Sequence, residues 1–425
     1  MRILKFGSTG PSVSFLQTAL IRRGYGGLAA DGVFGALTRS AVTDFQRASD
    51  LPADGIAGRL THNALMPWYL GFLDYTVRPG DTFYTIARRY GSGIAAIETA
   101  NPDADGEKLR VGSKLTVPLG FDVVPTDIDC CSLLIDCCVR GLSTRYPFLT
   151  RTQIGKSVMG RPLWRLGFGT GENRVLFNAS HHANEWITTT LLLKFTEELC
   201  KAYAGRAQIA SQSAQELFAY AELALIPAVN PDGIDLAAGE LQSGEYYDYA
   251  RRIALEYPQY SFPTGWKANI RGIDPNLQYP AGWEQARENK YALGIRSPAP
   301  ADFVGGAPLT APEPLAVYDF TRSFLPALTL SYHTQGEVIY WKYLDYLPPN
   351  SRVIADAFAA VSGYAVEDTP YASGFAGYKD WYIAAFDRPG YTIEAGKGVN
   401  PLPLAQFNDI YNANLGILTL GMIVT

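Results

Sequence analysis

Cysteine, histidine and charged residues are all scarce in this 425-residue chain, and the shortages exclude several classes of protein. Five cysteines without regular spacing do not make the disulfide framework of a small secreted scaffold. The formal net charge of −5 argues against nucleic acid as the main partner. No apolar run reaches the roughly 18–20 residues that a membrane-spanning helix needs, so we expect no membrane span.

Four of the cysteines form two pairs with the same spacing. Cys130 and Cys137 are seven residues apart, as are Cys131 and Cys138, which suits one face of a helix. These pairs could form a soft-metal site, but buried thiols in a reducing compartment are the interpretation that we favour. The fifth cysteine, Cys200, lies outside this segment.

The first 70 residues contain an imperfect repeat, in which DGVFGALT at 31–38 returns as DGIAGRLT at 54–61. In each copy the Asp-Gly pair predicts a tight turn, and the threonine predicts the start of a helix. An earlier helix is expected over residues 12–23, with Ser12 as its cap. Because a chain of this length exceeds one ordinary domain, we expect two or three domains.

The repeat and its flanking residues resemble the three-helix peptidoglycan-binding domain that lies beside many cell-wall hydrolases. The match extends over about residues 3–66 and includes Gly10, Leu16-Gln17, Gly24-Tyr25 and Phe45-Gln46. We assign residues 1–70 to this domain. Its one histidine, His62, has no second ligand candidate nearby in the sequence and is expected to be structural.

Residues 73–119 predict a second small module. A short strand at 75–77 runs into a Pro-Gly turn, and Asp81 or Thr82 can cap the helix that follows. A further helix over 94–100 stops at Asn101-Pro102, and a closing strand ends the module. The order strand, helix, helix, strand resembles a LysM domain, a domain that binds glycans containing N-acetylglucosamine. The resemblance implies that the sugar backbone of peptidoglycan is the partner.

An α/β domain is expected over residues 121–425, because buried apolar strands alternate there with helical stretches. This pattern predicts a mostly parallel sheet wrapped by helices. The candidate strands are residues 174–178, 223–227, 327–331 and 391–394. Polar residues lie at their C-terminal ends, where open α/β sheets form their sites.

Three of the four histidines lie beside these strands. His182 and Glu185 are three residues apart in the segment HHANEW, so a tight bend would turn both toward one ion. His333 can complete a set of two histidines and one glutamate with a position left for water, which is the catalytic arrangement of zinc. The HxxE spacing alone is a weak signal, and an ordinary pair of histidines at a strand end is the alternative.

The surrounding segments resemble the zinc metallocarboxypeptidase family over residues 125–425. They are NPDG at 230–233, WKANIRGIDPN at 266–276, the segment around His333, and Glu394. The resemblance implies an α/β/α fold with a mixed, mostly parallel sheet, and one Zn²⁺ ion held by His182, Glu185 and His333. His181 would then be a neighbour of the ion and not a ligand. Asp274 matches the family's carboxylate that orients the first zinc histidine.

The same resemblance implies the catalytic residues. Glu394 matches the general base that takes a proton from the zinc-bound water. In the family, a cation then stabilises the developing oxyanion. Lys267 stands where the family usually has arginine, and Arg271 is the competing candidate for this role. Tyr371 is the expected counterpart of the family's mobile tyrosine, with Tyr378 as the alternative.

Two positions depart from the family's pattern. The family grips the terminal carboxylate of its substrate with an adjacent Asn-Arg pair, but here Asn276 is followed by Leu277, which cannot make that contact. This weakens the case for a strict exopeptidase, unless Arg271 or another cation does the same work. Lys379 lies where the family selects the residue beside the cut. A lysine there favours a negatively charged substrate group, unless it is a solvated surface lysine.

Within the family, the assembly most resembles the γ-D-glutamyl-meso-diaminopimelate peptidases of spore-forming bacteria. The resemblance implies hydrolysis of the γ-D-Glu–meso-diaminopimelate bond in peptidoglycan stem peptides. An exo-acting zinc carboxypeptidase on murein tripeptides or ordinary peptides is one alternative, and a non-catalytic peptidoglycan-binding protein is the alternative of another class. Because residues 1–5 lack the apolar core of a secretory signal, we expect a protein that is cytoplasmic or released without a signal peptide and that acts on cell-wall or spore peptidoglycan.

Overall fold

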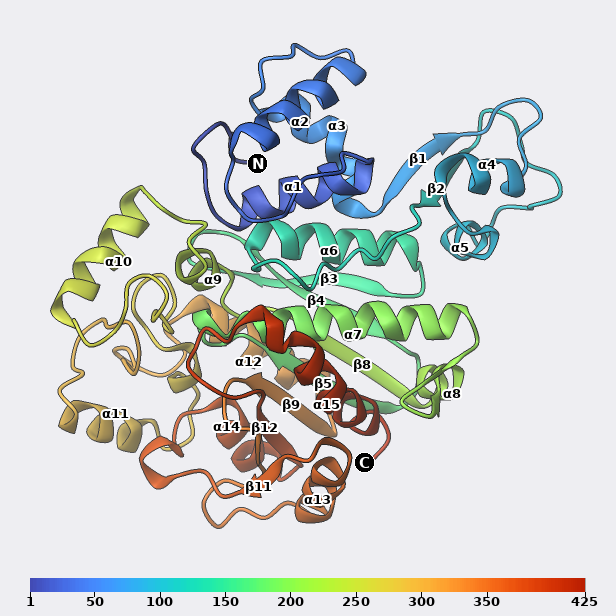
Figure 1. Cartoon of the computed structure of the whole chain (residues 1–425). Coiled ribbons are helices and arrows are strands. Elements are labelled where there is room, and N and C mark those ends of the chain that lie inside the picture. The colour runs from blue at the N-terminus through green and yellow to red at the C-terminus, as the bar shows by residue number, and fades with distance from the viewer. Residues whose placement is uncertain (425) are drawn as a thin grey trace. The chain divides into compact units, whose positions relative to one another are not determined.

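In the computed structural model, which describes residues 1–424, the chain forms two compact units (Figure 1). The first unit contains residues 1–128 and 133–150, and the second contains residues 129–132 and those from 151 onward. Most of helix α6 (Ser132–Arg145) therefore groups with the N-terminal unit, beyond the limit near residue 120 that the sequence suggests. Among residues 1–424, no helix is both long and apolar enough to cross a bilayer.

Three helices begin the first unit: α1 (Pro11–Arg23), α2 (Ala36–Ala48) and α3 (Arg59–Leu70). The expected helices are present, but the expected caps are wrong. The residue at the N-cap of each helix is a glycine, and neither Ser12 nor a threonine of the repeat has that position. The three glycines are Gly10, Gly35 and Gly58.

Two buried glutamines, Gln17 and Gln46, each close one Asp-Gly turn of the sequence repeat. The side-chain Nε2 donates to the aspartate carboxylate, to a backbone carbonyl two residues later and to the threonine hydroxyl, while Oε1 accepts from the glycine N–H. The distances are 2.8–3.1 Å around Gln17 and 2.9–3.0 Å around Gln46. The partners are Asp31, Gly32, Val33 and Thr38 in the first half, and Asp54, Gly55, Ile56 and Thr61 in the second.

The second module has the expected element order. Strands β1 (Phe72–Thr76) and β2 (Lys114–Pro118) pair antiparallel, and α4 (Phe83–Tyr90) and α5 (Ile94–Ala100) lie between them in the chain. Thr82 caps α4 through a reciprocal pair of hydrogen bonds with Thr85, at 3.1 and 2.9 Å. A small core holds these elements together, and it contains Tyr75, Val77, Phe83, Ile86, Ala87, Ile97, Leu115 and Val117.

The cysteine pairs do not share a helical face. Helix α6 begins at Ser132, so Cys130 and Cys131 precede it and the expectation from their spacing was wrong. All five cysteine side chains are buried, and burial raises the pKa of the Cys137 thiol to about 12. Within residues 1–424, no cysteine belongs to a group of side chains placed to hold a metal ion.

An eight-stranded sheet forms the centre of the second unit. Its strands are β3 (Thr150–Lys156), β4 (Pro162–Phe168), β5 (Asn173–Ala179), β8 (Ala221–Ile226), β9 (Leu328–His333), β10 (Val338–Tyr340), β11 (Ala365–Glu367) and β12 (Gly390–Glu394). The order is β11-β10-β12-β9-β5-β8-β4-β3. Strands β12, β9, β5 and β8 are parallel, while β4 and β10 run antiparallel to β8 and β12. This confirms the expected mixed, mostly parallel sheet.

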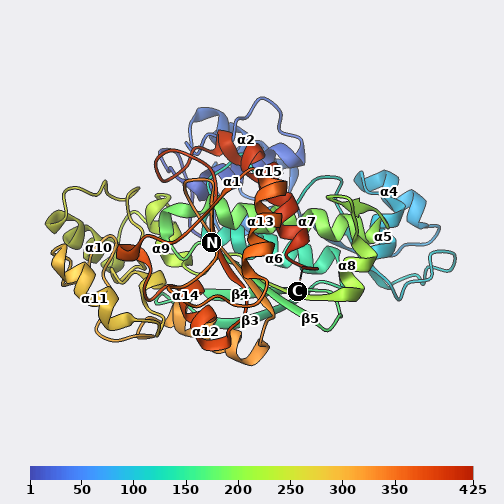
Figure 2. The same ribbon diagram turned by 90° about the horizontal axis from the view of Figure 1, so that it is seen from below.

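Helices cover both faces of the sheet (Figure 2). On one face lie α12 (Pro312–Phe324) and α14 (Tyr378–Phe386), whose Val317 and Trp381 share a core cluster with Leu176 of β5. The next residue, Phe177, points the other way and meets Gly421, directly after α15 (Phe407–Leu420). Helix α15 packs between α7 (Ile187–Ala204) and α13 (Ser351–Ser362). The connections contain β6 (Gln208–Ile209), β7 (Gln212–Ser213), α8 (Ala214–Tyr220), α9 (Pro231–Ala237), α10 (Glu245–Glu256) and α11 (Trp283–Ala292).

Candidate active site

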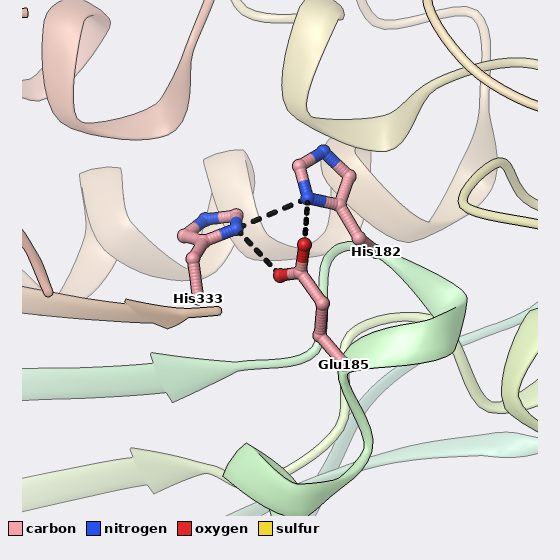
Figure 3. A group of neighbouring side chains, drawn as sticks. All are labelled: His182, Glu185 and His333. Atoms are coloured by element: carbon pink, nitrogen blue, oxygen red, sulfur yellow. Dashed lines mark hydrogen bonds and ion pairs between the residues drawn. The ribbon is translucent and has the colours of Figure 1, made fainter. Parts of the chain in front are cut away.

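Two histidines and a glutamate converge at the C-terminal ends of β5 and β9 (Figure 3). His182 follows β5 and precedes the short 3-10 helix η1 (Ala183–Glu185), and His333 is the last residue of β9. The turn of η1 brings His182 Nδ1 within 3.0 Å of Glu185 Oε1, and His333 Nδ1 lies 3.0 Å from Glu185 Oε2. The two Nδ1 atoms are 3.2 Å apart.

This donor set fits a metal cation. Two imidazole nitrogens face each other and the same carboxylate, and a cation between them would satisfy all three groups. Glu185 and His333 are only 1% and 2% exposed, so the negative charge of Glu185 needs a close positive partner. Two histidines with one carboxylate, and positions left open, are the ligands of catalytic zinc. The structure therefore brings together the three residues expected from the sequence to hold Zn²⁺.

Asp274 supports His182 from its far side. Its Oδ1 lies 3.3 Å from His182 Nε2, which leaves Nδ1 of the ring for the ion. Its Oδ2 accepts a hydrogen bond from Asp302 N at 3.2 Å. The carboxylate also accepts from Asn276 N at 3.0 Å and so caps the 3-10 helix η2 (Pro275–Leu277). Although burial opposes ionisation, the neighbouring His182 holds the pKa of Asp274 well below its usual range.

His181 is a packing residue beside the site. Its Nε2 lies 2.9 Å from the hydroxyl of Tyr279, and its ring stacks on His333 at 5.8 Å between centroids. Complete burial lowers its pKa well below the ordinary value, so the ring is neutral.

Asn400 and Thr334 support Glu185, and the sequence did not single them out. Asn400 Nδ2 donates to Glu185 Oε1 at 3.4 Å and to Thr334 O at 2.9 Å. Thr334 Oγ1 donates to Asn400 Oδ1 at 2.7 Å, and Thr334 N donates to Glu185 Oε2 at 3.4 Å. Thr334 could have been identified from the sequence, because it directly follows His333. Asn400 is 215 residues from Glu185, so no local pattern could have identified it.

A cavity of about 270 Å³ opens beside the three convergent residues, and Glu394 and Lys267 line it with His182 and His333. Glu394 ends β12, and burial raises its pKa. Lys267 Nζ lies 3.2 Å from Glu185 Oε1. Although burial favours the neutral amine, the carboxylates of Glu185 and its neighbours raise the pKa of Lys267. A carboxylate and a cation thus share one cavity with the candidate metal ligands.

One arginine and two tyrosines are the remaining candidates from the sequence. Arg271 is exposed in the turn after Lys267. Tyr371 is 65% exposed on the 3-10 helix η3 (Tyr371–Ser373), with its ring 5.0 Å from that of Phe375. Tyr378 lines the cavity but is only 1% exposed, and its hydroxyl lies 3.1 Å from Thr321 Oγ1. Of the two tyrosines, Tyr371 is therefore the exposed one, whereas Tyr378 is buried.

The positions that depart from the family's pattern also line the cavity. Leu277 is apolar and 8% exposed, and Asn276 Oδ1 accepts from Tyr378 N at 3.0 Å. Lys379 is only 4% exposed, so it is not a solvated surface lysine. Its Nζ donates to Lys342 O at 2.6 Å and to Asp380 Oδ1 at 2.5 Å. Asp380 was not anticipated, although it follows Lys379 directly in the sequence.

Lys290 is another lining residue that the sequence did not indicate. Its Nζ donates to Asp302 Oδ1 at 2.6 Å, and both residues line the cavity. Asp302 in turn donates its backbone N–H to Asp274. Lys290 lies on α11 without any motif around it, so only the folded chain brings it to the site.

Comparison with known proteins identifies the family. The sequence profile of the family described as zinc carboxypeptidase matches residues 135–398. The chain belongs to the zinc carboxypeptidase family. The profiles of a peptidoglycan binding domain and of the LysM domain match residues 9–65 and 75–118 of this zinc carboxypeptidase. All three matches confirm the resemblances found in the sequence, and zinc is the metal of the family.

Two relatives match about two thirds of this chain. Gamma-D-glutamyl-L-diamino acid endopeptidase 1 of Lysinibacillus sphaericus is 42% identical over 284 residues, 67% of this chain and 70% of the relative. The uncharacterized protein YqgT of Bacillus subtilis is 41% identical over 277 residues, 64% of this chain and 72% of the relative. The structure of bovine thrombin-activatable fibrinolysis inhibitor aligns at a TM-score of 0.54 and 18% identity, over 70% of this chain and 97% of that chain, and it shares the fold.

Proposed function

We propose that this zinc carboxypeptidase hydrolyses the bond between γ-D-glutamate and meso-diaminopimelate in peptidoglycan stem peptides, as an endopeptidase. The observation that carries the proposal is the apolar side chain of Leu277 in the wall of the cavity that also contains Glu394. The relative from Lysinibacillus sphaericus supports the choice of bond, because it is named a gamma-D-glutamyl-L-diamino acid endopeptidase.

The side chain of Leu277 favours an endopeptidase over an exopeptidase. An exopeptidase needs a cation that binds the terminal carboxylate of its substrate, and a leucine cannot supply one. The neighbouring Asn276 uses its Oδ1 to accept from Tyr378 N at 3.0 Å, so that oxygen holds the start of α14 in place. A substrate that continues beyond the diamino acid therefore meets an apolar wall at this position.

The residues would divide the reaction as follows. His182, Glu185 and His333 would hold Zn²⁺, which lowers the pKa of water and polarises a carbonyl. Glu394, fixed at the end of β12, accepts the proton of the attacking water at its carboxylate. The same carboxyl then gives that proton to the departing amine of the diamino acid.

Lys267 is the cation that can stabilise negative charge on the carbonyl oxygen of the substrate. It lines the cavity, its side chain is 32% exposed, and its pKa is raised, so the amine is charged. Arg271 is exposed outside this group, which favours Lys267 for the role.

The N-terminal modules support peptidoglycan as the material on which the enzyme acts. The peptidoglycan-binding match at 9–65 and the LysM match at 75–118 would hold glycan strands while the second unit cuts the stem peptide. We place this action on cell-wall or spore peptidoglycan.

Mass spectrometry of two synthetic peptides tests the proposal. L-Ala-γ-D-Glu-meso-diaminopimelate and its D-Ala-extended form are incubated with the intact chain, with and without a zinc chelator. We expect release of L-Ala-D-Glu from both peptides, and we expect the chelator to stop it.

Other results would favour the alternatives. Cleavage of the shorter peptide alone would mean an exo-acting carboxypeptidase. Cleavage of neither, by protein that carries stoichiometric zinc, would contradict the proposed substrate. Protein purified without chelators that lacks zinc and activity would indicate a non-catalytic wall-binding protein.

A further inference from the structure

A tight turn follows Lys267, and the side chain of Asn269 closes it. Asn269 Oδ1 accepts from the backbone N–H groups of Arg271 and Ile273 at 3.0 and 3.1 Å. The backbone closes the same turn, because Asn269 N donates to Ile273 O at 2.8 Å. Lys267 lies two residues before Asn269, and Asp274 directly follows Ile273. This turn therefore connects the cation of the cavity to the carboxylate that supports the first candidate metal ligand.

A buried glutamate holds Asn269 from outside this turn. Glu313 lies in the first turn of α12, and its Oε2 accepts from Asn269 Nδ2 at 3.1 Å. Its Oε1 accepts from Val158 N, between β3 and β4, at 3.0 Å. Asn269 and Glu313 are both 0% exposed. One carboxylate thus joins three segments that are far apart in the sequence, and it fixes the orientation of the Asn269 amide.

The contacts at position 313 require a carboxylate. Two N–H groups point at it, those of Val158 and Asn269, and a carboxylate offers one oxygen to each. A glutamine would offer only one oxygen, and its NH2 group would face the second donor. The negative charge is costly in this place, because burial raises the pKa of Glu313 to about 7. An uncharged residue would avoid this cost but would lose one of the two hydrogen bonds.

Backbone hydrogen bonds hold Lys267 as well. Lys267 N donates to Pro300 O at 2.8 Å, and Lys267 O accepts from Ala183 N at 2.9 Å. Ala183 directly follows His182, so these bonds place the backbone of the lysine beside the candidate metal site. The direction in which the chain continues is decided by the turn at Asn269. Stabilisation of charge in a transition state is sensitive to a misplacement of about 1 Å, so loosening this turn should impair the lysine.

We infer that Asn269 and Glu313 are positioning residues, which hold Lys267 where negative charge develops on the carbonyl oxygen of the substrate. The inference rests on the proposed function, which gives Lys267 this role. Both side chains are fully buried, so they act through the lysine and do not contact the substrate. Because Lys267 contributes most in the transition state, loss of the Glu313 contact should lower kcat and leave KM nearly unchanged.

A double-mutant cycle between Glu313→Gln and Lys267→Met tests the inference. The intact, zinc-loaded chain is assayed with L-Ala-γ-D-Glu-meso-diaminopimelate at pH 8, where a carboxyl with a pKa of about 7 is ionised. We expect Glu313→Gln to lower kcat about 10- to 100-fold and to keep one zinc ion per chain. In the Lys267→Met background the same substitution should change kcat less than about twofold, because the cation that it positions is gone.

A swapped pair gives an independent test. In the double variant Asn269→Asp, Glu313→Gln, the carboxylate at position 269 accepts from the amide at position 313, whose oxygen still accepts from Val158 N. The turn also keeps an acceptor for its two backbone N–H groups. We expect kcat of this variant to exceed that of Glu313→Gln alone by about 10-fold or more. Asn269→Asp alone brings two carboxylates together and should be impaired like Glu313→Gln.

Asn414→Ala is the control for a loss of stability alone. It breaks another buried hydrogen bond, from Asn414 Nδ2 to the hydroxyl of Tyr364 at 2.9 Å, and it should unfold at a lower urea concentration with the kcat of the wild type. Glu313→Asp keeps the charge and shortens the side chain, so the same cycle applies to it if Glu313→Gln does not fold.

The outcomes separate the two proposals. Wild-type kcat in folded Glu313→Gln would overturn the inference, and so would equal losses of kcat in the wild-type and Lys267→Met backgrounds. A swapped pair no faster than Glu313→Gln would show that the contact with Asn269 does not matter. Wild-type kcat in Lys267→Met would contradict the proposed role of Lys267, and the inference with it. Failure of the wild type to cleave the peptide would contradict the proposed function itself.

Discussion

Glu394 and His333 are the last residues of neighbouring parallel strands, β12 and β9, and they pair in register. The sheet therefore fixes the general base that we propose beside a candidate metal ligand, without help from a loop. A shift of one residue in this pairing would turn a side chain to the opposite face of the sheet. Because the strand backbone fixes the position of Glu394, its carboxylate can be replaced without moving the candidate metal site.

Glu394→Gln should keep one zinc ion per chain but reduce stem-peptide hydrolysis about 10²- to 10⁴-fold, because only the proton acceptor is lost. Metal analysis and product quantification by mass spectrometry check both parts. Glu367→Gln, an exposed position on β11, is the matched control and should be fully active. Substantial turnover by Glu394→Gln would show that another group is the base.

His182→Ala should lose zinc, because two of the three candidate ligands cannot hold the ion firmly. The adjacent His181→Ala should keep zinc and lose stability instead, since His181 packs against Tyr279 with its Nε2 2.9 Å from the hydroxyl. Zinc content after dialysis against a weak chelator, together with thermal unfolding, distinguishes the two variants. Stoichiometric zinc in His182→Ala would mean that His181 is the ligand.

Asp274→Asn should weaken zinc binding about 10- to 100-fold, because the carboxylate that orients His182 is replaced by an amide. Competition with a fluorescent chelator measures the affinity. Asp302→Asn is a useful control, because Asp302 contacts Asp274 through its backbone N–H and not its side chain. Equal affinities of Asp274→Asn and the wild type would remove Asp274 from the site.

Stability should fall as pH rises from about 4.5 to about 7, because of Glu313. This carboxyl is buried, and burial raises its pKa from 4.5 to about 7, although Val158 N and Asn269 Nδ2 donate to it at 3.0 and 3.1 Å. A raised pKa means that the native state binds the proton more tightly than the unfolded state. Deprotonation therefore lowers the free energy of unfolding, by up to about 3 kcal/mol.

Urea unfolding at several pH values, with chelator present, checks this against Glu313→Gln. The amide does not titrate, so the wild type should lose stability relative to the variant between about pH 4.5 and pH 7. Parallel pH dependences of the two proteins would show that Glu313 is ionised throughout this range.

The sequence contains enough to predict that the candidate metal ligands and the proposed base lie close together, because these residues lie at strand ends. His182, His333 and Glu394 each follow or end a buried apolar run, and parallel strands bring such ends to one edge of the sheet. The central strands β5, β8, β9 and β12 were predicted for the same reason. Strands β10 and β11, with three residues each, are too short to show any periodicity.

The rest of the site depends on contacts between distant segments. Asn400 reaches Glu185 across 215 residues, and Lys290 joins the cavity from a helix without a motif. The charge balance of the cavity could not be predicted from the sequence either. Lys379 alone would make the cavity wall positive, but in the structure it is paired with Asp380. The caps of α2 and α3 were mispredicted because the repeated threonines bind glutamine side chains instead of helix ends.

The two halves of the first module differ in one respect that suggests a practical use. Gln17 precedes Asp31 by 14 residues, whereas Gln46 precedes Asp54 by only eight, yet both glutamines make the same set of bonds. Four of the six extra residues lengthen α1 after Gln17, and two lengthen the loop that follows it. That loop, residues 24–30, is half-buried to exposed and rich in glycine. Loop length is thus free to vary here while the turn stays closed. A fluorescent tag inserted in this loop would allow the proposed attachment of the enzyme to intact cell walls to be tested under a microscope.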